Sequence, residues 1–288
     1  MTVVRGVVAR WTTAVDRRYQ SMTDLGGLPM IVLTQMPLWL SGLLLVVIPT
    51  ILAMAAIFLI RRAAPLELLA ENNEVAGFKF AVVGVLYAVL LAFAIIVVWE
   101  RFSETESDVA TEAGASATLY RLADGLSAPA GPDIHAAITT YLDSIIGEEW
   151  PAMERGEEDA GTTRTLDSLY TTVLSLQPTA DRESVVLEAM LTQLDILTEA
   201  RRARLVATVG IVPGVLWVVL FGGAAVTIGF TFFFGARSLR AQSLMTGILT
   251  VLICSGVLVI VAIEYPFTGD VHVSPDAIVK VLEDLKEN

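Results

Sequence analysis

FAVVGVLYAVLLAFAIIVVW, residues 80–99, is a run of 20 residues without a charged side chain. A helix of about 20 apolar residues is long enough to cross the roughly 30 Å hydrocarbon core of a bilayer. Further uncharged runs occupy residues 38–60, 205–236 and 241–263. The sequence therefore predicts an all-α, polytopic membrane protein with four transmembrane helices.

The composition of the 288-residue chain also favours a membrane location. Hydrophobic residues make up 55% of it and charged residues 17%, whereas about 25% of the residues of soluble proteins are charged. The net charge is −12, and binding to nucleic-acid phosphates needs clustered Lys and Arg. We expect the lipid bilayer as a partner and no nucleic acid.

The segments between the apolar runs differ greatly in length. Residues 61–79 and 237–240 are short, whereas residues 101–203 hold 19 acidic and 7 basic residues and carry the whole net charge. We therefore predict a helical cytoplasmic domain inserted between the second and third transmembrane helices. The predicted organisation is an N-terminal amphipathic segment (1–36), transmembrane helices 1 and 2 (37–100), the acidic helical domain (101–203), transmembrane helices 3 and 4 (204–264) and a C-terminal tail (265–288).

Arginines near the helix ends indicate the orientation, because cytoplasmic loops carry an excess of Lys and Arg. A narrow majority lies on the side of the termini and the acidic domain, which places both in the cytoplasm. The N-terminal segment has apolar residues at helical spacing with arginines between them. It fits a helix in the headgroup region or one packed on the acidic domain, and the sequence does not decide between the two.

Apolar residues recur at helical spacing within the acidic domain. Residues 133–150 predict an amphipathic helix that Pro151 ends, and apolar stripes over 166–174 and 186–197 predict two more. A loop is expected over 154–163, which is rich in glycine and charge.

Two membrane helices are expected to extend beyond the bilayer. Residues 103–126 follow Trp99 without a helix breaker, and residues 188–204 run into the third apolar run without Pro or Gly. Within that run Pro213 and several glycines predict a kinked or broken helix.

No catalytic chemistry is predicted. The chain lacks GxSxG, Walker A, HExxH and paired CxxC motifs, and the four apolar runs contain no Asp, Glu or His. The single cysteine, Cys254, has no neighbouring base. We expect neither an enzyme nor a bound cofactor or metal.

Polar residues gather at the ends of the apolar runs. They are Asn72, Asn73, Glu74 and Lys79 before the second run, Trp99, Glu100 and Arg101 after it, and Glu264 and Asp270 after the fourth. Interface anchoring or helix capping explains each of them, and a specific site at a pore mouth is the alternative.

Small residues lie at spacings of three and four along the second apolar helix. They are Gly77, Ala81, Gly84, Ala88 and Ala92. Small faces let helices approach closely, and rings of apolar side chains can gate ions by dewetting. The pattern fits tight packing or an axial pore surrounded by copies of this helix.

Several short motifs resemble the bestrophin-like family of bacterial membrane proteins. They are NNEVAGF at 72–78, GVLYA at 84–88, Trp99-Glu100, Glu112-Ala113, LYR at 119–121, EWP at 149–151, and Pro266-Phe267-x-Gly269-Asp270. The layout is also distantly similar to that of bestrophins, which are pentameric ion channels with four membrane helices and a large helical cytoplasmic domain.

The resemblance implies an oligomeric ion channel, most simply a homopentamer, in the bacterial cytoplasmic (inner) membrane. It places Gly77, Ala81, Gly84, Val85 and Ala88 along the pore, Asn72, Asn73, Glu74 and Lys79 at its mouth, and Pro266, Phe267, Gly269 and Asp270 in a tail motif. Small inorganic ions are the implied partners. A non-conducting membrane scaffold or sensor, whose acidic domain recruits a partner, is the alternative function.

The sequence departs from the bestrophin pattern in two ways. The bulky neck residues of bestrophins correspond to positions near Gly77, Ala81 and Val85, so this neck is expected to be wider or built differently. The acidic run after Asp270 is missing, and calcium needs several oxygen ligands, so calcium gating is not expected. Copies of the acidic domain create a negative potential, which repels anions. We therefore do not extend the anion selectivity of most bestrophins to this chain.

Overall fold

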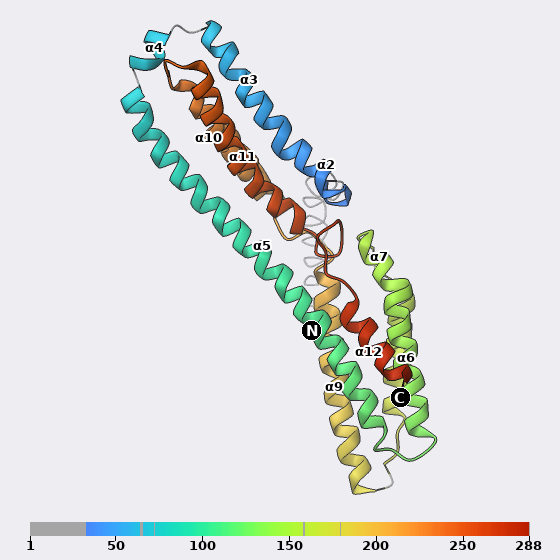
Figure 1. Cartoon of the computed structure of the whole chain (residues 1–288). Helices are drawn as coiled ribbons and strands as arrows, with labels where there is room; N and C mark the ends of the chain where they lie inside the picture. The colour runs from blue at the N-terminus through green and yellow to red at the C-terminus, as the bar shows by residue number, and fades with distance from the viewer. Residues whose placement is uncertain (1–32, 64–65, 72, 158, 179, 288) are drawn as a thin grey trace, which may run out of the picture. The chain divides into compact units, whose positions relative to one another are not determined.

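The computed structural model describes residues 33–63, 66–71, 73–157, 159–178 and 180–287 (Figure 1). Every regular element within these ranges is a helix. Four of the helices are long and apolar enough to span a membrane. The prediction of an all-α protein with four transmembrane helices is thereby confirmed.

The four candidate spans are Leu38–Ala63, Asn73–Ala123, Gly214–Phe233 and Leu239–Ile263. The first combines α2 (Leu38–Gly42), the π-helical turn η1 (Leu43–Val47) and α3 (Ile48–Ala63). The second is α5 (Asn73–Ala123). The third consists of α10 (Gly214–Phe230) with the 3-10 turn η3 (Thr231–Phe233), and the fourth is α11 (Leu239–Ile263).

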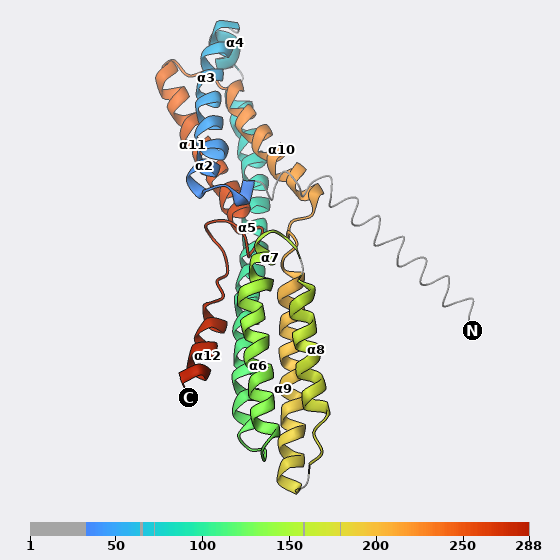
Figure 2. The same cartoon turned by 90° about the vertical axis from the view of Figure 1, so that its right-hand side faces the viewer.

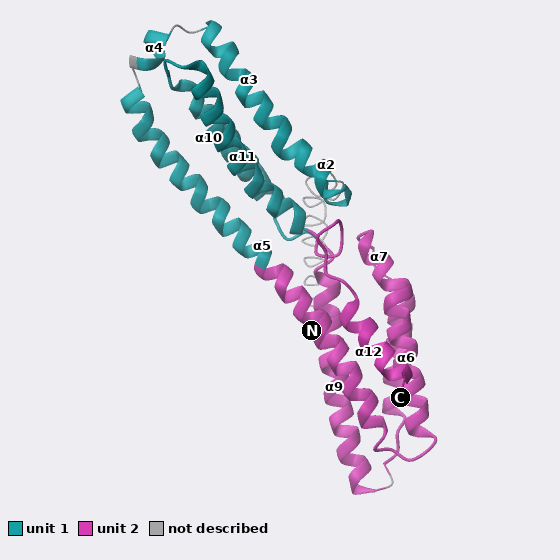
Figure 3. Ribbon diagram, in the orientation of Figure 1, with its two compact units in different colours: residues 1–99, 210–264 teal, residues 100–209, 265–288 magenta. Residues whose placement is uncertain are grey.

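The chain divides into two compact units, coloured in Figure 3: unit 1 is Met1–Trp99 with Gly210–Glu264, and unit 2 is Glu100–Val209 with Tyr265–Asn288. Unit 1 holds the apolar spans and the short helix α4 (Leu66–Glu71). In unit 1, α11 is the central helix, since half of its apolar window is buried against 11% for the first two spans.

Glycines in unit 1 allow its helices to approach closely. A Cβ on Gly223 of α10 would lie 2.5 Å from the Tyr87 ring, and one on Gly256 of α11 would lie 2.6 Å from Leu91. These contacts surround a small core formed by Tyr87, Ala224 and Ile253. Close packing of this kind is the usual basis of helix association in membranes.

Unit 2 is a helical bundle built on the second part of α5. Its other helices are α6 (Ala130–Ser144), η2 (Ile145–Glu149), α7 (Trp150–Glu154), α8 (Ala160–Leu174), α9 (Asp181–Val206) and α12 (Asp276–Glu287). Figure 2 shows α6, α8 and α9 running alongside one another. Each of these three helices contributes fully buried residues to the core, for example Ile138, Leu169 and Leu194.

Two boundaries predicted in the acidic domain are wrong. The helix does not end at Pro151 but continues to Glu154, because the π-helical turn Ile145–Glu149 precedes the proline, which then lies in the first turn of α7, where a missing N–H costs little. The loop expected over 154–163 is shorter, because Asp159 caps α8 by accepting a hydrogen bond from Thr162 N at 2.6 Å.

The two expected helix extensions have different outcomes. Residues 103–123 do prolong the second membrane helix, because α5 runs unbroken from Asn73 to Ala123. The expected continuity of residues 188–204 with the third span is wrong. Helix α9 ends at Val206 and α10 begins after Pro213, as the predicted break at that proline requires. Most of the N-terminal segment, residues 1–32, and Asn72 lie outside the described residues.

Candidate functional site

Helix α5 presents three different faces in unit 1. The first packs inside the unit: Ala76 and Tyr87 are buried, and Phe80 is half-buried, with its ring centroid 6.0 Å from that of Phe230 and 5.7 Å from that of Phe234. Tyr87 Oη donates a hydrogen bond to the Leu220 carbonyl oxygen at 3.1 Å. These contacts fix the rotation of α5 about its own axis, and so determine which of its side chains remain uncovered.

The second face holds the small residues that the sequence places along a pore. Ala81, Val85 and Ala88 are exposed, and no atom lies within 4 Å of where a Cβ on Gly84 would be. A Cβ on Gly77 would lie 3.9 Å from the Phe234 ring. Four of the five predicted pore residues are thus uncovered within this chain.

The third face carries large apolar side chains. Its members include Val82, Leu86, Val89 and Phe93, of which Leu86 and Phe93 are 66% and 65% exposed. At 100° per residue the centre of this face lies about 120° around the helix from the centre of the small face. The uncovered surface of α5 therefore changes from small to bulky side chains around the helix.

Asn73 has a specific role at the start of α5. Its Nδ2 donates to the Gly235 carbonyl oxygen at 2.8 Å, and Gly235 N donates to Asn73 Oδ1 at 2.9 Å. Only glycine fits there, because a Cβ would lie 2.7 Å from Ala70 N. Asn73 thus joins α5 to the α10–α11 connection, while Glu74 and Lys79 are exposed.

The tail motif forms a compact turn in unit 2. Pro266 and Phe267 are buried, and Val273 N donates to the Pro266 carbonyl oxygen at 2.7 Å. Gly269 has φ 82°, a conformation that favours glycine. Asp270 is exposed. The Phe267 ring meets Trp150 edge-on at 5.4 Å, so the tail packs on α7.

A buried ion-pair cluster in unit 2 was not predicted. Arg204 of α9 donates through Nε to Glu112 Oε2 at 2.6 Å and through Nη2 to Glu112 Oε1 at 3.0 Å and Glu149 Oε2 at 2.6 Å. Tyr141 Oη donates to Glu112 Oε1 at 2.6 Å. Both carboxylates and the guanidinium are fully buried.

Arg201 completes the cluster. It pairs with Glu149 and donates through Nη2 to Thr163 Oγ1 at 3.1 Å. With two arginines and two glutamates the group is electrically balanced. The Arg204 guanidinium also lies 5.5 Å from the centre of the Trp150 ring, a cation–π arrangement. The cluster therefore joins α5, η2, α8 and α9, and through Trp150 it contacts the tail turn.

The pKa values in the cluster follow its charges. Burial lowers the pKa of Arg204, but the carboxylates of Glu112 and Glu149 raise it by more, so the net shift is upward. Burial, then the charge of Glu112, raises the pKa of Tyr141 well above its ordinary value. Arg204 stays charged and Tyr141 stays neutral at any physiological pH.

One sequence signal could have revealed this cluster. Each charged member extends an apolar stripe at a spacing of three or four: Val109 precedes Glu112, Ile145 precedes Glu149, and Leu197 precedes Arg201. Two acidic and two basic residues at core positions on three different helices indicate partners for one another, because unpaired buried charges are very costly.

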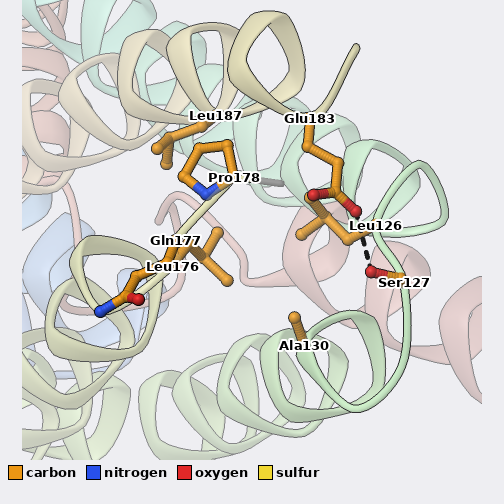
Figure 4. Close-up of a pocket in the computed structure, with 8 residues that line it drawn as sticks. All are labelled: Leu126, Ser127, Ala130, Leu176, Gln177, Pro178, Glu183 and Leu187. Carbon is orange, nitrogen blue, oxygen red and sulfur yellow. Dashed lines mark hydrogen bonds between the residues drawn. The ribbon is translucent and has the colours of Figure 1, made fainter. Parts of the chain in front are cut away.

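Two cavities lined by described residues of unit 2 do not suggest a ligand site. Figure 4 shows one of about 80 Å³ beside Leu126, Pro178 and Leu187, where Ser127 Oγ donates to Glu183 Oε1 at 2.8 Å. Sites for small molecules usually measure about 300–1,000 Å³ and are mostly apolar. An open groove of about 500 Å³ between α6 and α8 is lined by polar residues such as Thr140, Glu148 and Arg164. The described residues contain no group of three or more potential metal ligands.

Comparison with known proteins identifies the fold. A family model for the bestrophin-like domain matches residues 47–278. No curated protein matches the chain.

Solved structures share the architecture at low sequence identity. A crystal structure of a bacterial bestrophin homologue from Klebsiella pneumoniae, carrying one substitution, is 16% identical, with a TM-score of 0.64 over 83% of this chain and 99% of that one. Another structure of the homologue from this organism is 15% identical, with a TM-score of 0.64 over 84% and 97%. A structure described as a membrane protein is 18% identical, with a TM-score of 0.63 over 85% and 97%.

Proposed function

Because the chain belongs to the bestrophin-like family, we propose that it forms a homo-oligomeric ion channel in the bacterial cytoplasmic membrane. In this proposal the small face of α5, with Gly77, Ala81, Gly84, Val85 and Ala88, surrounds an axial pore. The most economical assembly is a pentamer, as in the bestrophins that the layout resembles. The termini and unit 2 lie on the cytoplasmic side.

The uncovered small face of α5 is the observation that carries the proposal. The Phe80 and Tyr87 contacts hold α5 in one rotation, which leaves Ala81, Gly84 and Ala88 free for other copies. Small side chains permit close approach of helices around an axis. Apolar rings at a constriction can control conduction by dewetting, so the lack of charge along this face is compatible with a gate.

The polar residues at the start of α5 belong to the proposed pore mouth. Glu74 and Lys79 are exposed, so both are free to meet passing ions. Asn73 contributes instead by holding α5 to Gly235. The proposal includes no anion selectivity, because unit 2 is strongly acidic.

Electrical recording of the purified oligomer in a planar bilayer under a KCl gradient tests conduction and selectivity together. We expect a current whose reversal potential reports the permeant ion. Gly84→Trp should abolish most of this current, because it fills the small face. Leu86→Trp is the matched control, since it changes an exposed residue on the bulky face and should leave the current within about twofold.

Native mass spectrometry supplies the oligomeric state of both variants. Equal currents from Gly84→Trp and wild type, with assembly intact, would show that this face does not line the pore. A monomer or dimer that carries no current would favour a membrane scaffold whose acidic domain recruits a partner.

A further inference from the structure

Glu264, the residue that follows α11, has an unusual environment. It is 1% exposed, and its Oε1 accepts a hydrogen bond from Val212 N at 2.9 Å. Its other oxygen, Oε2, is buried without a hydrogen-bond partner. A buried carboxylate normally has a counter-charge or several donors, so this arrangement suits a neutral carboxylic acid better than an ion.

The rest of the described part of unit 1 offers this carboxyl no counter-charge. The other charged residues in the described part of unit 1 belong to the opposite end of its helices: Arg61, Arg62, Glu67, Glu71, Glu74, Lys79, Arg237 and Arg240. Arg240, in the first turn of α11, is separated from Glu264 by about 36 Å of helical rise. Figure 1 shows α3, α4 and α5 meeting at that distant end.

The segments that adjoin Glu264 in the chain or donate hydrogen bonds to it also carry no charge. Residues 207–213, the first turn of α10 and the last turn of α11 contain no titratable side chain, and Tyr265 is the nearest such residue along the chain. The interactions that act on the Glu264 carboxyl are burial and the backbone N–H groups of Val212 and Ile211. Burial and these two backbone groups, rather than a neighbouring charged side chain, therefore set the protonation of Glu264.

Glu264 is also the last residue of unit 1 before the chain enters unit 2. The polypeptide passes between units 1 and 2 at residues 99–100, 209–210 and 264–265. The hydrogen bond from Val212 to Glu264 links the second and third of these passages. Residues 207–213 are the break between α9 and α10, and Pro213 denies that segment helical continuity.

We propose that Glu264 is a proton-binding latch, whose neutral form holds the connection 207–213 in place and whose ionised form releases it. In the neutral form Oε1 accepts the Val212 N–H bond and Oε2 carries the proton. Ionisation places a full charge at a buried site that has only backbone donors. The segment then opens to let water reach the carboxylate, because no charged side chain among the described residues of unit 1 compensates it.

The direction of the pH effect follows from the burial. Burial raises the pKa of Glu264, which lies just outside the spanning helices, from 4.5 to about 8, although the N–H groups of Val212 and Ile211 lower it. The folded state therefore binds this proton more tightly than the unfolded chain does. Stability is greatest below about pH 4.5 and falls as the pH rises towards 8.

Hydrogen exchange measured by mass spectrometry tests the latch on the full-length oligomer. Peptides covering 207–213 should lose protection in the wild type between pH 6 and 9, after correction for the intrinsic exchange rate. Glu264→Gln keeps the acceptor oxygen and cannot ionise, so its protection should stay high and constant. Glu283→Gln, an exposed change on α12, is the matched control and should behave like the wild type.

Infrared difference spectroscopy gives a second reading, which follows the carboxyl group itself and can be made on the wild type alone. The wild type should lose a protonated-carboxyl band between pH 6 and 9, and Glu264→Gln should lack that loss. Protection that is independent of pH in the wild type, or the same pH profile in Glu264→Gln, would overturn the proposal. Neither measurement uses ion flux, so both are independent of the proposed channel function.

Discussion

Arg204 satisfies two carboxylates at once through a single guanidinium, and all three groups are removed from water. Taking charges into a protein interior is costly, and their mutual attraction offsets that cost only when geometry is good and every donor is used. Here Nη1, the nitrogen that does not reach a carboxylate, contacts Met153 Sδ at 3.1 Å. The buried charges of the cluster therefore compensate one another only while all four charged residues are present.

Removing Arg204 should destabilise unit 2 strongly. Arg204→Met keeps much of the side-chain volume but leaves Glu112 without its buried cation and Glu149 with only Arg201. Breaking a buried pair by deleting one partner costs about 3–5 kcal/mol. The unfolding temperature of the purified protein in detergent should fall clearly, and Arg202→Met, at an exposed neighbouring position, should change it little. Equal unfolding temperatures for the two variants would show that the cluster is not a major source of stability.

The helices of unit 1 depend on glycines at particular contacts. Gly222 and Gly223 are adjacent in α10, yet a Cβ on Gly223 would lie 2.5 Å from the Tyr87 ring, whereas nothing lies within 4 Å of one on Gly222. The aromatic ring cannot withdraw easily, because Tyr87 Oη is bonded to Leu220 O. One methyl group should therefore have opposite consequences at these two positions.

Gly223→Ala should lower the stability of the purified protein by about 1–3 kcal/mol, the usual cost of overpacking. Gly222→Ala should be neutral or slightly stabilising, because alanine is the better helix former. Thermal unfolding in the same detergent compares the two directly. A Gly223→Ala variant as stable as Gly222→Ala would mean that α5 and α10 separate easily, and the fixed rotation of α5 would lose its support.

The accuracy of prediction at the level of elements depended on the kind of signal. Uncharged runs located the four spans, because the bilayer demands length and apolarity regardless of tertiary contacts. Proline was a weaker guide: Pro213 does mark a break, but Pro151 lies in the first turn of α7 after a π-helical turn that removes the conflict. The outcome at each proline depends on the preceding backbone, which local sequence does not reveal.

The candidate site could be predicted only in part, because some of its features depend on contacts between residues far apart in the sequence. The small residues of α5 could be read from their spacing, and the structure shows their exposure within one chain. The Glu112, Glu149, Arg201 and Arg204 cluster depends on contacts between residues up to 92 positions apart. The position of each charge on an apolar stripe indicates burial, but which charges pair with one another could be found only once the helices were brought together.

At the scale of the whole molecule, the distribution of charge sets a condition on the proposed channel. Residues 101–203 carry the entire net charge of −12, and the remaining residues are balanced. Within this segment the buried Glu112, Glu149 and Arg201 contribute only −1, which Arg204 just outside it neutralises, so nearly all of the excess negative charge belongs to the other residues of the segment. An oligomer multiplies this charge, and a negative potential concentrates cations and repels anions.

The proposed channel should therefore show a selectivity that depends on salt. The screening length is about 10 Å at 0.1 M and about 3 Å at 1 M ionic strength, so the field of unit 2 acts on ions in dilute solution and is lost in concentrated solution. Reversal potentials measured in KCl gradients of equal ratio should shift towards the potassium equilibrium at low salt and away from it at high salt. Gradients balanced with an uncharged osmolyte control for water flow. The contradicting result is a ratio of the reversal potential to the potassium equilibrium potential that is the same at both salt concentrations. That result would show that the selectivity arises in the uncharged pore. Apolar contacts and dehydration would then have to discriminate between ions without help from the acidic unit.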